Sequence, residues 1–192
     1  MESAVRRRKA LIDKLSEFKP FEQAGKQIEK HLRDEVAEDG ARALIEHLYL
    51  CGAIPEGLEH DSTEEKVYSK YTDALLSVTF EAMGLNSATL EERADSADVK
   101  VQAKKYSFVG DAKAFRLSRT AKNQKDFKIE SMDKWKGDCD HALVVAPIVH
   151  LPTGRSQIYE QAIRRGVCLL GYTHVVSHAL SPPVRQGISP CL

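Results

Sequence analysis

Cysteine is scarce in this chain of 192 residues, and the few cysteines do not cluster. There are four of them, Cys51, Cys139, Cys168 and Cys191, and no two form a CxxC pair. Closely spaced cysteines are the usual sign of a zinc site, and a dense set in a small chain indicates a disulfide framework. Because the sequence has neither pattern, we expect no such site and a reducing, cytoplasmic environment.

Long apolar runs are also missing. The basic residues 6–9 look like the charged start of a signal peptide, but Asp13 and Glu17 soon follow and no apolar stretch comes after them. No segment approaches the roughly 20 apolar residues that a membrane-spanning helix needs. We therefore expect neither a signal peptide nor a membrane partner.

The chain has no net charge, since 28 basic residues balance 28 acidic ones. The two signs are nevertheless separated along the sequence. Residues 53–98 contain eleven Asp or Glu against three Lys or Arg, whereas residues 100–128 contain nine Lys or Arg against two Asp. Because a local basic field attracts a polyanion even on a neutral protein, residues 100–128 are the candidate region for binding nucleic acid.

Helices are predicted throughout the first 60 residues, where apolar side chains recur every three or four positions. Two amphipathic helices divide near Pro20, and a third ends at Gly52. We interpret residues 1–60 as a helical packing layer without chemistry of its own. A longer helix begins at Ser62, where Glu65 stands at the spacing of a capping box, and Gly84 marks its end.

Strands are predicted in the second half of the chain. After a polar loop at residues 86–95, an alternating segment opens at Asp98, and nearly continuous apolar runs follow at residues 141–149 and 167–172 on either side of a helix at 156–165. The predicted fold class is α/β (α+β), a mixed central sheet flanked by helices with an N-terminal helical layer. We expect one domain over residues 1–180, with its core at 61–180, and an irregular, proline-containing tail at 181–192.

Two acids and a lysine form the candidate catalytic site. On a strand, Asp111 and Lys113 point to the same face while Ala112 points into the core. A hairpin centred on residues 104–105 sets Asp98 opposite Asp111, with facing carboxylates roughly 4.5 to 5.5 Å apart. Such a pair is expected to hold a hard divalent cation, so we predict Mg²⁺ bound by Asp98, Asp111 and the backbone carbonyl of Ala112, with Lys113 beside an attacking water.

The acid-x-lysine pattern is weak evidence alone, because it occurs five times, beginning at Glu17, Glu64, Asp98, Asp111 and Asp126. Only at Asp111 does an apolar segment come before the pattern and a basic run directly after it. Otherwise the segment reads as a two-stranded ribbon with a solvated polar face.

The basic run extends from Arg116 to Lys128. Its cationic residues recur every third position, which suits a helix, with Ser118 or Thr120 as its cap. Arg and Lys suit DNA phosphates and guanine, and Asn and Gln suit adenine, so we predict DNA contacts here, although a solvated charged face is the alternative. The predicted contact residues are Arg116, Ser118, Arg119, Lys122, Asn123, Gln124, Lys125 and Lys128. Further along the chain, Arg155 fits either a DNA contact or the surface, and His174 and His178 fit packing or surface positions.

Three segments together resemble the HindIII family of type II restriction endonucleases, within the PD-(D/E)xK nuclease superfamily. They are DAKAFRLSRTAKNQKDFK (residues 111–128), STEEK (62–66) and SQIYEQ (156–161), within a likeness that spans residues 55–173. By this resemblance Asp111 and Lys113 match the family's catalytic pair, and Asp126 matches a further acid needed for cleavage. Asp98 is placed by strand register alone, because Ala97 stands where the superfamily's name-giving proline is expected.

The resemblance implies a restriction-endonuclease-like core and an enzyme dependent on Mg²⁺, for which Mn²⁺ can substitute. It also implies a homodimer that cuts double-stranded DNA at a short palindrome, AAGCTT in the namesake, in a restriction-modification system with a cognate DNA methyltransferase. In related nucleases a glutamate of the helix before the sheet approaches the metal. Glu64 and Glu65 are therefore candidates for that role, with helix capping as the alternative. Family members normally continue into a further helical region, so a DNA-binding remnant is one alternative and a repair or recombination nuclease another.

Overall fold

A five-stranded mixed sheet lies at the centre of the protein. The computed structural model describes residues 1–90, 96–118 and 124–180. The strand order is β2 (Asn86–Thr89), β3 (Val99–Gln102), β4 (Ser107–Ala112), β6 (His141–Ala146) and β7 (Val167–Gly171). The pairs β2/β3 and β3/β4 are antiparallel, whereas β4/β6 and β6/β7 are parallel. The catalytic candidates therefore lie where the sheet changes from antiparallel to parallel.

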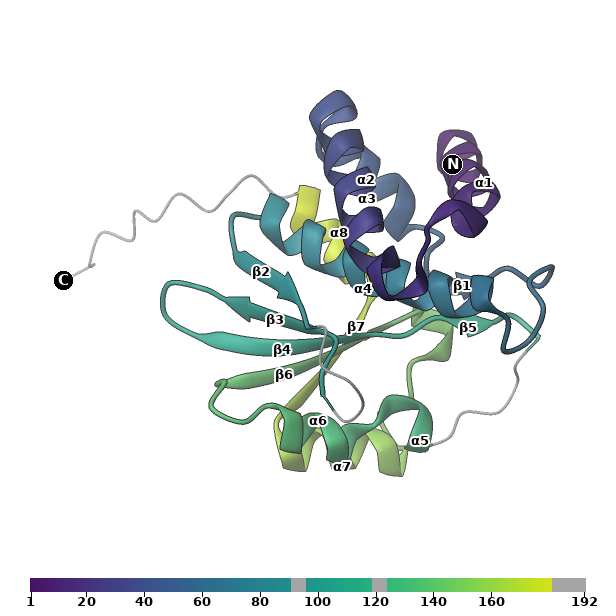
Figure 1. Ribbon diagram of the computed structural model, residues 1–192. Helices are drawn as coiled ribbons and strands as arrows, with labels where there is room; N and C mark the ends of the chain where they lie inside the picture. The colour runs from purple at the N-terminus through teal and green to yellow at the C-terminus, as the bar shows by residue number, and fades with distance from the viewer. Residues whose placement is uncertain (91–95, 119–123, 181–192) are drawn as a thin grey trace.

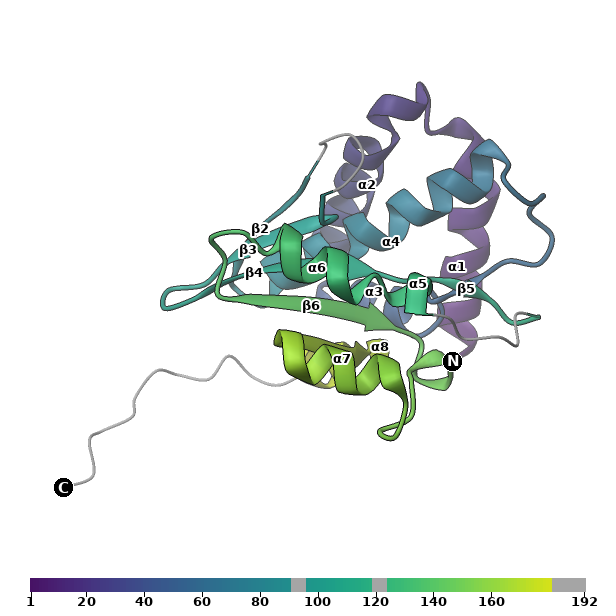
Figure 2. The same cartoon turned by 90° about the horizontal axis from the view of Figure 1, so that it is seen from below.

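Helices cover both faces of this sheet (Figures 1 and 2). On one face lies α4 (Thr63–Ala82) with α8 (Tyr172–Leu180), and outside α4 lie α1 (Glu2–Lys14), α2 (Ala24–Asp39) and α3 (Ala41–Leu48). On the other face lie α5 (Gln124–Phe127), α6 (Ile129–Trp135) and α7 (Gln157–Arg165). Short 3₁₀ turns are η1 (Leu15–Glu17), η2 (Phe21–Gln23) and η3 (Ile148–His150).

The two helical layers bury separate apolar cores. Val99, Val101 and Val145 face the core under α4, whereas Val109 and Val144 face the core under α5 to α7. This alternation is the two-residue period of a strand buried on both faces, because neighbouring side chains point to opposite sides. The predicted mixed α/β architecture with N-terminal helices is confirmed.

Several elements differ from the prediction. The segment at 86–89 was expected to be loop and is the edge strand β2, and residues 172–180, for which no helix was predicted, form α8. A second, two-stranded parallel ladder pairs β1 (Ala53–Ile54) with β5 (Phe115–Arg116). Isolated two-residue strands carry too little pattern to be predicted. Residues 181–192, the expected tail, lie outside the described residues.

The long helix α4 begins as predicted, with one change in its cap. The Ser62 hydroxyl accepts a hydrogen bond from the Glu65 amide at 3.1 Å. The Glu65 carboxylate, however, accepts from the amide of Asp61 at 2.7 Å instead of from the cap residue itself. Among residues 1–90, 96–118 and 124–180, the structure contains no helix that is both long and apolar enough to cross a membrane.

A buried ion-pair network ties the N-terminal helices together. The guanidinium of Arg7 lies 2.8 Å from Glu46, 2.5 Å from Asp39 and 3.1 Å from Glu35. The side chains of Arg7 and Glu46 are only 14% and 9% exposed, so the pair is shielded from solvent screening. The hydrogen bond from Arg7 is the main cause that lowers the pKa of Glu46 to about 2.

We expect Glu46→Gln to lower the free energy of unfolding by about 3 kcal/mol at pH 7, because Arg7 loses a buried counter-ion. A depressed pKa stabilises the fold above the unfolded value of 4.5, and this contribution disappears as pH falls toward about 2. Urea denaturation at pH 7 and pH 2.5 should therefore show a large difference from the parent only at pH 7. The matched control is Asp13→Asn, which breaks an exposed pair with Lys9 and should cost less than about 0.5 kcal/mol. Equal losses in the two variants would contradict the expectation.

Candidate active site

The register of β3 and β4 brings two carboxylates together. Val99 pairs with Gly110, and the same register continued by one residue sets Asp98 opposite Asp111. The Asp98 amide donates to the Gly110 carbonyl at 3.2 Å, so the pairing does extend that far. This is the hairpin register predicted from the sequence, with its turn at residues 104–105. Asp98 and Asp111 face the same side of the sheet as Val109.

Asp111 is almost fully buried and has a cation beside it. Its exposure is 1%, and Nζ of Lys113 lies 2.5 Å from its Oδ2, with the lysine side chain itself 14% exposed. This contact is an ion pair, and within the described residues Oδ2 accepts no hydrogen bond. Ala112, between them, is buried in the opposite core, as the strand alternation requires. Asp111 therefore presents a buried oxygen that is balanced by charge alone.

The repulsion between the two carboxyl groups is seen in the raised pKa of Asp98. Burial is the first cause that raises the pKa of Asp98, followed by the negative charge of Asp111 and a hydrogen bond between the two carboxyl groups. Lys113 and Lys128 act in the opposite direction. Two adjacent carboxyl groups that share a hydrogen bond retain a proton between them unless a cation replaces it. The pair is therefore arranged to exchange a proton for a cation.

A third acid, Asp73 of α4, lies within the same electrostatic field. Burial, then the charges of Asp98 and Asp111, raise the pKa of Asp73 well above its ordinary value. This residue was not among those predicted from the sequence. Its signal was an acid inside the apolar stretch YTDALLSV, where a solvated charge is not expected. The glutamates considered on this helix, Glu64 and Glu65, lie more than two turns earlier.

The other predicted catalytic residue, Asp126, lies on α5 and is partly buried. It is not among the principal groups that shift the pKa of Asp98 or Asp73, whereas Lys128 is. Lys128, predicted as a DNA contact, also places its ammonium 5.2 Å from the centroid of the Trp135 ring. Lys128 therefore lies close enough to the carboxylates to offset their charge, and the role of Asp126 stays a prediction.

The start of the basic run is bound to an acidic loop. Arg116 lies on β5, and its guanidinium donates to Glu65 at 2.7 and 3.0 Å and to the Leu58 carbonyl at 2.8 Å. Ser118 donates through its amide and hydroxyl to the two carboxylate oxygens of Glu56, at 3.0 and 3.1 Å. For either residue to contact DNA, phosphates must replace these carboxylates.

The prediction of a single helix over the basic run is wrong for its described residues, which belong to a strand and to two short helices. Arg116 is in a strand, and Lys128 has a φ of 46°, a left-handed conformation that separates the four-residue α5 from α6. Arg119, Lys122 and Asn123 lie outside the described residues. Gln124 and Lys125 belong to α5, but the structure describes only their main chain. These five stay predicted DNA contacts.

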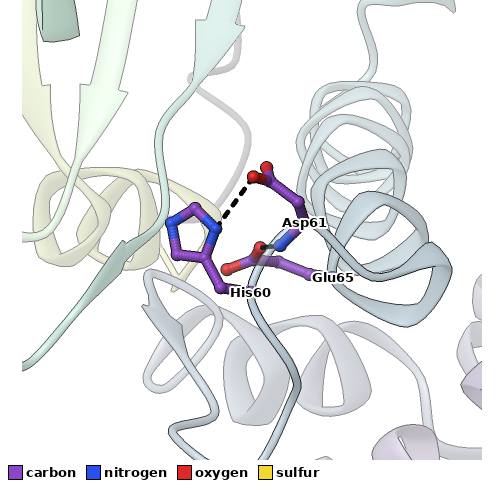
Figure 3. Close-up of side chains that lie close together, drawn as sticks. All are labelled: His60, Asp61 and Glu65. Atoms are coloured by element: carbon purple, nitrogen blue, oxygen red, sulfur yellow. Dashed lines mark hydrogen bonds and ion pairs between the residues drawn. The ribbon is translucent and has the colours of Figure 1, made fainter.

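A second group with metal-ligand chemistry lies at the start of α4 (Figure 3). Its members are His60, Asp61 and Glu65, whose ligand atoms lie within 4.8 Å of one another. His60 Nδ1 is 3.0 Å from Asp61, and both of these side chains are more than three-quarters exposed. Both oxygens of Glu65 already accept hydrogen bonds, one from Asp61 and the other from Arg116. This group therefore serves to hold the loop before α4 against β5.

Comparison with known proteins identifies the family of this chain. The family model of the HindIII restriction endonuclease matches residues 10–183. The chain belongs to the HindIII restriction endonuclease family. It is 37% identical over 175 residues to the type II restriction enzyme HindIII of Haemophilus influenzae (strain Rd). That match covers 90% of this chain and 57% of the relative, so the chain spans little more than half the length of the curated relative it matches.

The carboxylate pair of this HindIII family member fits a hard divalent cation. Asp111 offers a buried oxygen without a hydrogen bond, and Asp98 stands opposite it with a raised pKa. Both donors are oxygens, which Mg²⁺ and Mn²⁺ prefer, and neither cysteine nor histidine belongs to the pair. A divalent charge also removes the repulsion that makes the pairing costly. The residues present therefore fit the cation that the sequence predicted.

Asp73→Asn is expected to raise the free energy of unfolding by about 1 kcal/mol at pH 7 in EDTA. A carboxyl whose folded pKa lies above its unfolded value of 3.8 destabilises the fold increasingly as pH rises past 3.8. The gain should therefore vanish near pH 3.5, which urea denaturation at the two pH values will measure. Asp34→Asn, at an exposed position on α2, is the control and should change little. A variant less stable than the parent at pH 7 would refute the electrostatic reading.

Proposed function

We propose that the protein is a Mg²⁺-dependent type II deoxyribonuclease that cuts double-stranded DNA at a short palindrome. The observation that carries the proposal is the facing pair Asp98 and Asp111 with the Lys113 ammonium 2.5 Å from Asp111. Family membership supports the same chemistry. A sequence related to AAGCTT is the first candidate for the recognition site, because it is the site of the family's namesake.

Asp98, Asp111 and the backbone carbonyl of Ala112 are the residues that would hold Mg²⁺, for which Mn²⁺ can substitute. When bound, the cation supplies positive charge against the phosphoryl oxygens and favours ionisation of water. The carboxylates themselves fix where that charge sits relative to β4. Asp73 adds a third carboxyl near the pair, and Asp126 is proposed to assist cleavage from α5.

Lys113 has the role of positioning and charge compensation. Its ammonium lies 2.5 Å from Oδ2 of Asp111 in a largely buried setting, where an electrostatic contact is stronger than in water. We assign it to orient the water that attacks phosphorus and to stabilise the negative charge that develops on a phosphoryl oxygen. As the water oxygen bonds to phosphorus, the water releases one proton to solvent; the phosphorus–oxygen bond on the opposite side breaks, and the leaving oxygen takes up one proton from solvent.

DNA binding is proposed along the basic run and its neighbours. Arg116 lies at the start of this run, on β5, and Lys128 lies at its end, directly before α6. The proposed contacts are Arg116, Ser118, Arg119, Lys122, Asn123, Gln124, Lys125 and Lys128. A palindromic target requires two copies related by a two-fold axis, so we propose a homodimer in which each copy cuts one strand. In a cytoplasmic host setting, a cognate DNA methyltransferase would protect the same sites.

The test is incubation of the purified chain with supercoiled and linear plasmid in Mg²⁺, Mn²⁺, Ca²⁺ or EDTA. Discrete fragments in Mg²⁺ or Mn²⁺ but not in EDTA, with ends that map to one palindrome, are the expected result. Two outcomes would replace the proposal. A gel shift without cutting favours a DNA-binding remnant, and cutting that depends on DNA structure and not on sequence favours a repair or recombination nuclease.

A further inference from the structure

The main chain of Lys113 is held from two sides just where it leaves the sheet. Its amide donates to the carbonyl of Val145 on β6 at 2.7 Å. Its carbonyl accepts a hydrogen bond from the hydroxyl of Tyr172 on α8 at 3.1 Å. The regular ladder of β4 and β6 ends at Ala112, so beyond it these two hydrogen bonds hold the amide and the carbonyl of Lys113.

Tyr172 has little freedom to move. It is 4% exposed and is the first residue of α8, directly after β7, a strand that pairs with β6. Its ring packs against Gly52, where an added Cβ would lie 2.8 Å from Cε2 of the ring and 2.7 Å from Cγ of Pro147. Real Cβ atoms do not approach so closely, so position 52 admits no side chain while the ring stays in place.

Gly52 connects this contact to the chain that follows Lys113. Its carbonyl accepts a hydrogen bond from the amide of Phe115 at 2.9 Å. Lys113 and Phe115 are thus fixed on one side by the Tyr172 hydroxyl and on the other by the backbone at Gly52. Tyr172 contacts both places, through its hydroxyl at the Lys113 carbonyl and through its ring at Gly52.

The Tyr172 hydroxyl remains a donor under working conditions. Burial raises the pKa of Tyr172 well above its ordinary value, and the nearby Cys51 thiol and Asp73 carboxyl act in the same direction. A protonated phenol donates one hydrogen bond, and the Lys113 carbonyl receives it.

We propose that Tyr172 is a positioning residue that orients Lys113 for catalysis by holding its main-chain carbonyl. The inference rests on the proposed nuclease function. The carbonyl carbon is bonded to the Cα that carries this side chain, so the main chain at Lys113 can shift when the hydrogen bond is lost, and a shift of Cα displaces the ammonium from Asp111. Small displacements of a group that orients a nucleophile reduce rates strongly, while substrate binding at a distance is unaffected.

The decisive variant is Tyr172→Phe, which keeps the ring and removes only the hydroxyl. We expect the single-turnover cleavage rate to fall about tenfold, with DNA affinity measured in Ca²⁺ and the Mg²⁺ concentration for half-maximal rate both within twofold of the parent. The matched control is Tyr71→Phe, which removes a buried hydroxyl that lies 2.9 Å from Nδ1 of His47. It should lose comparable stability and retain the cleavage rate.

A readout independent of cleavage separates this inference from the proposed function. In protein labelled with ¹³C-lysine, the ε-methylene signal of Lys113, assigned with Lys113→Arg, should shift in Tyr172→Phe and stay in place in Tyr71→Phe. If the parent does not cut DNA but the signal still shifts in Tyr172→Phe, the positioning of Lys113 is supported and the proposed nuclease function is refuted. An unchanged signal, a parental cleavage rate in Tyr172→Phe, or an equal loss of rate in Tyr71→Phe overturns the positioning.

Discussion

Replacing Asp111 with asparagine is expected to reduce DNA cleavage on the order of a thousandfold while DNA binding in Ca²⁺ stays within threefold. The substitution removes the buried oxygen charge that faces Asp98 and the counter-ion of Lys113, but it preserves side-chain shape. Asparagine also relieves the repulsion between the two acids, so the fold is expected to survive, as thermal unfolding in EDTA will check.

The control for Asp111→Asn is Asp34→Asn, which removes an exposed carboxylate paired with Lys30 on α2. It should cut at the parental rate. Isothermal titration with Mn²⁺ adds a second measurement, because the heat of binding should disappear in Asp111→Asn and persist in the control. If Asp111→Asn retained more than a tenth of the parental rate, Asp111 would not be at the reaction centre.

Lys113→Ala is expected to slow cleavage on the order of a hundredfold and to lower stability at the same time. Without the ammonium 2.5 Å away, Asp111 keeps a charge at 1% exposure that has lost its ion-pair partner, which should cost about 2 kcal/mol in EDTA. Saturating Mg²⁺ should recover part of this loss, because a bound cation replaces the missing charge. Urea denaturation with and without Mg²⁺, beside single-turnover cleavage, measures both effects.

Lys30→Ala serves as the control for Lys113→Ala, since its ammonium is 78% exposed and pairs with Asp34 on the surface. It should alter neither rate nor stability measurably. A Lys113→Ala variant with parental cleavage, or one whose DNA affinity falls as much as its rate, would assign the lysine to DNA binding instead of catalysis.

The sequence predicted those parts of the site that depend on local pairing. A tight hairpin fixes its own register, so the positions of Asp98 and Asp111 follow from the turn at residues 104–105 and from strand alternation. The alternation also placed Ala112 in the core. The buried runs at β6 and β7 and the helix between them were equally local signals.

What the sequence did not predict depends on contacts between distant segments. Asp73 joins the acids only because α4 crosses the sheet, and Arg116 meets Glu65 across 51 positions. The strand β2, with the sequence NSAT, forms because β3 offers it an edge, and its own residues carry no apolar alternation. The basic residues at every third position of the run predicted one helix. Instead, β5 pairs with β1, and the left-handed conformation of Lys128 separates α5 from α6.

The ladder of β1 with β5 changes how the N-terminal helical layer should be regarded. Ala53 and Ile54 follow α3 within this layer, and they pair with Phe115 and Arg116 just downstream of Lys113. The Ala53 carbonyl in turn accepts hydrogen bonds from the side chains of Arg8 and Tyr68. A chain trimmed to begin at α4 would thus lack β1, and β5, which follows the candidate catalytic residues, would lose its only neighbouring strand within the described residues.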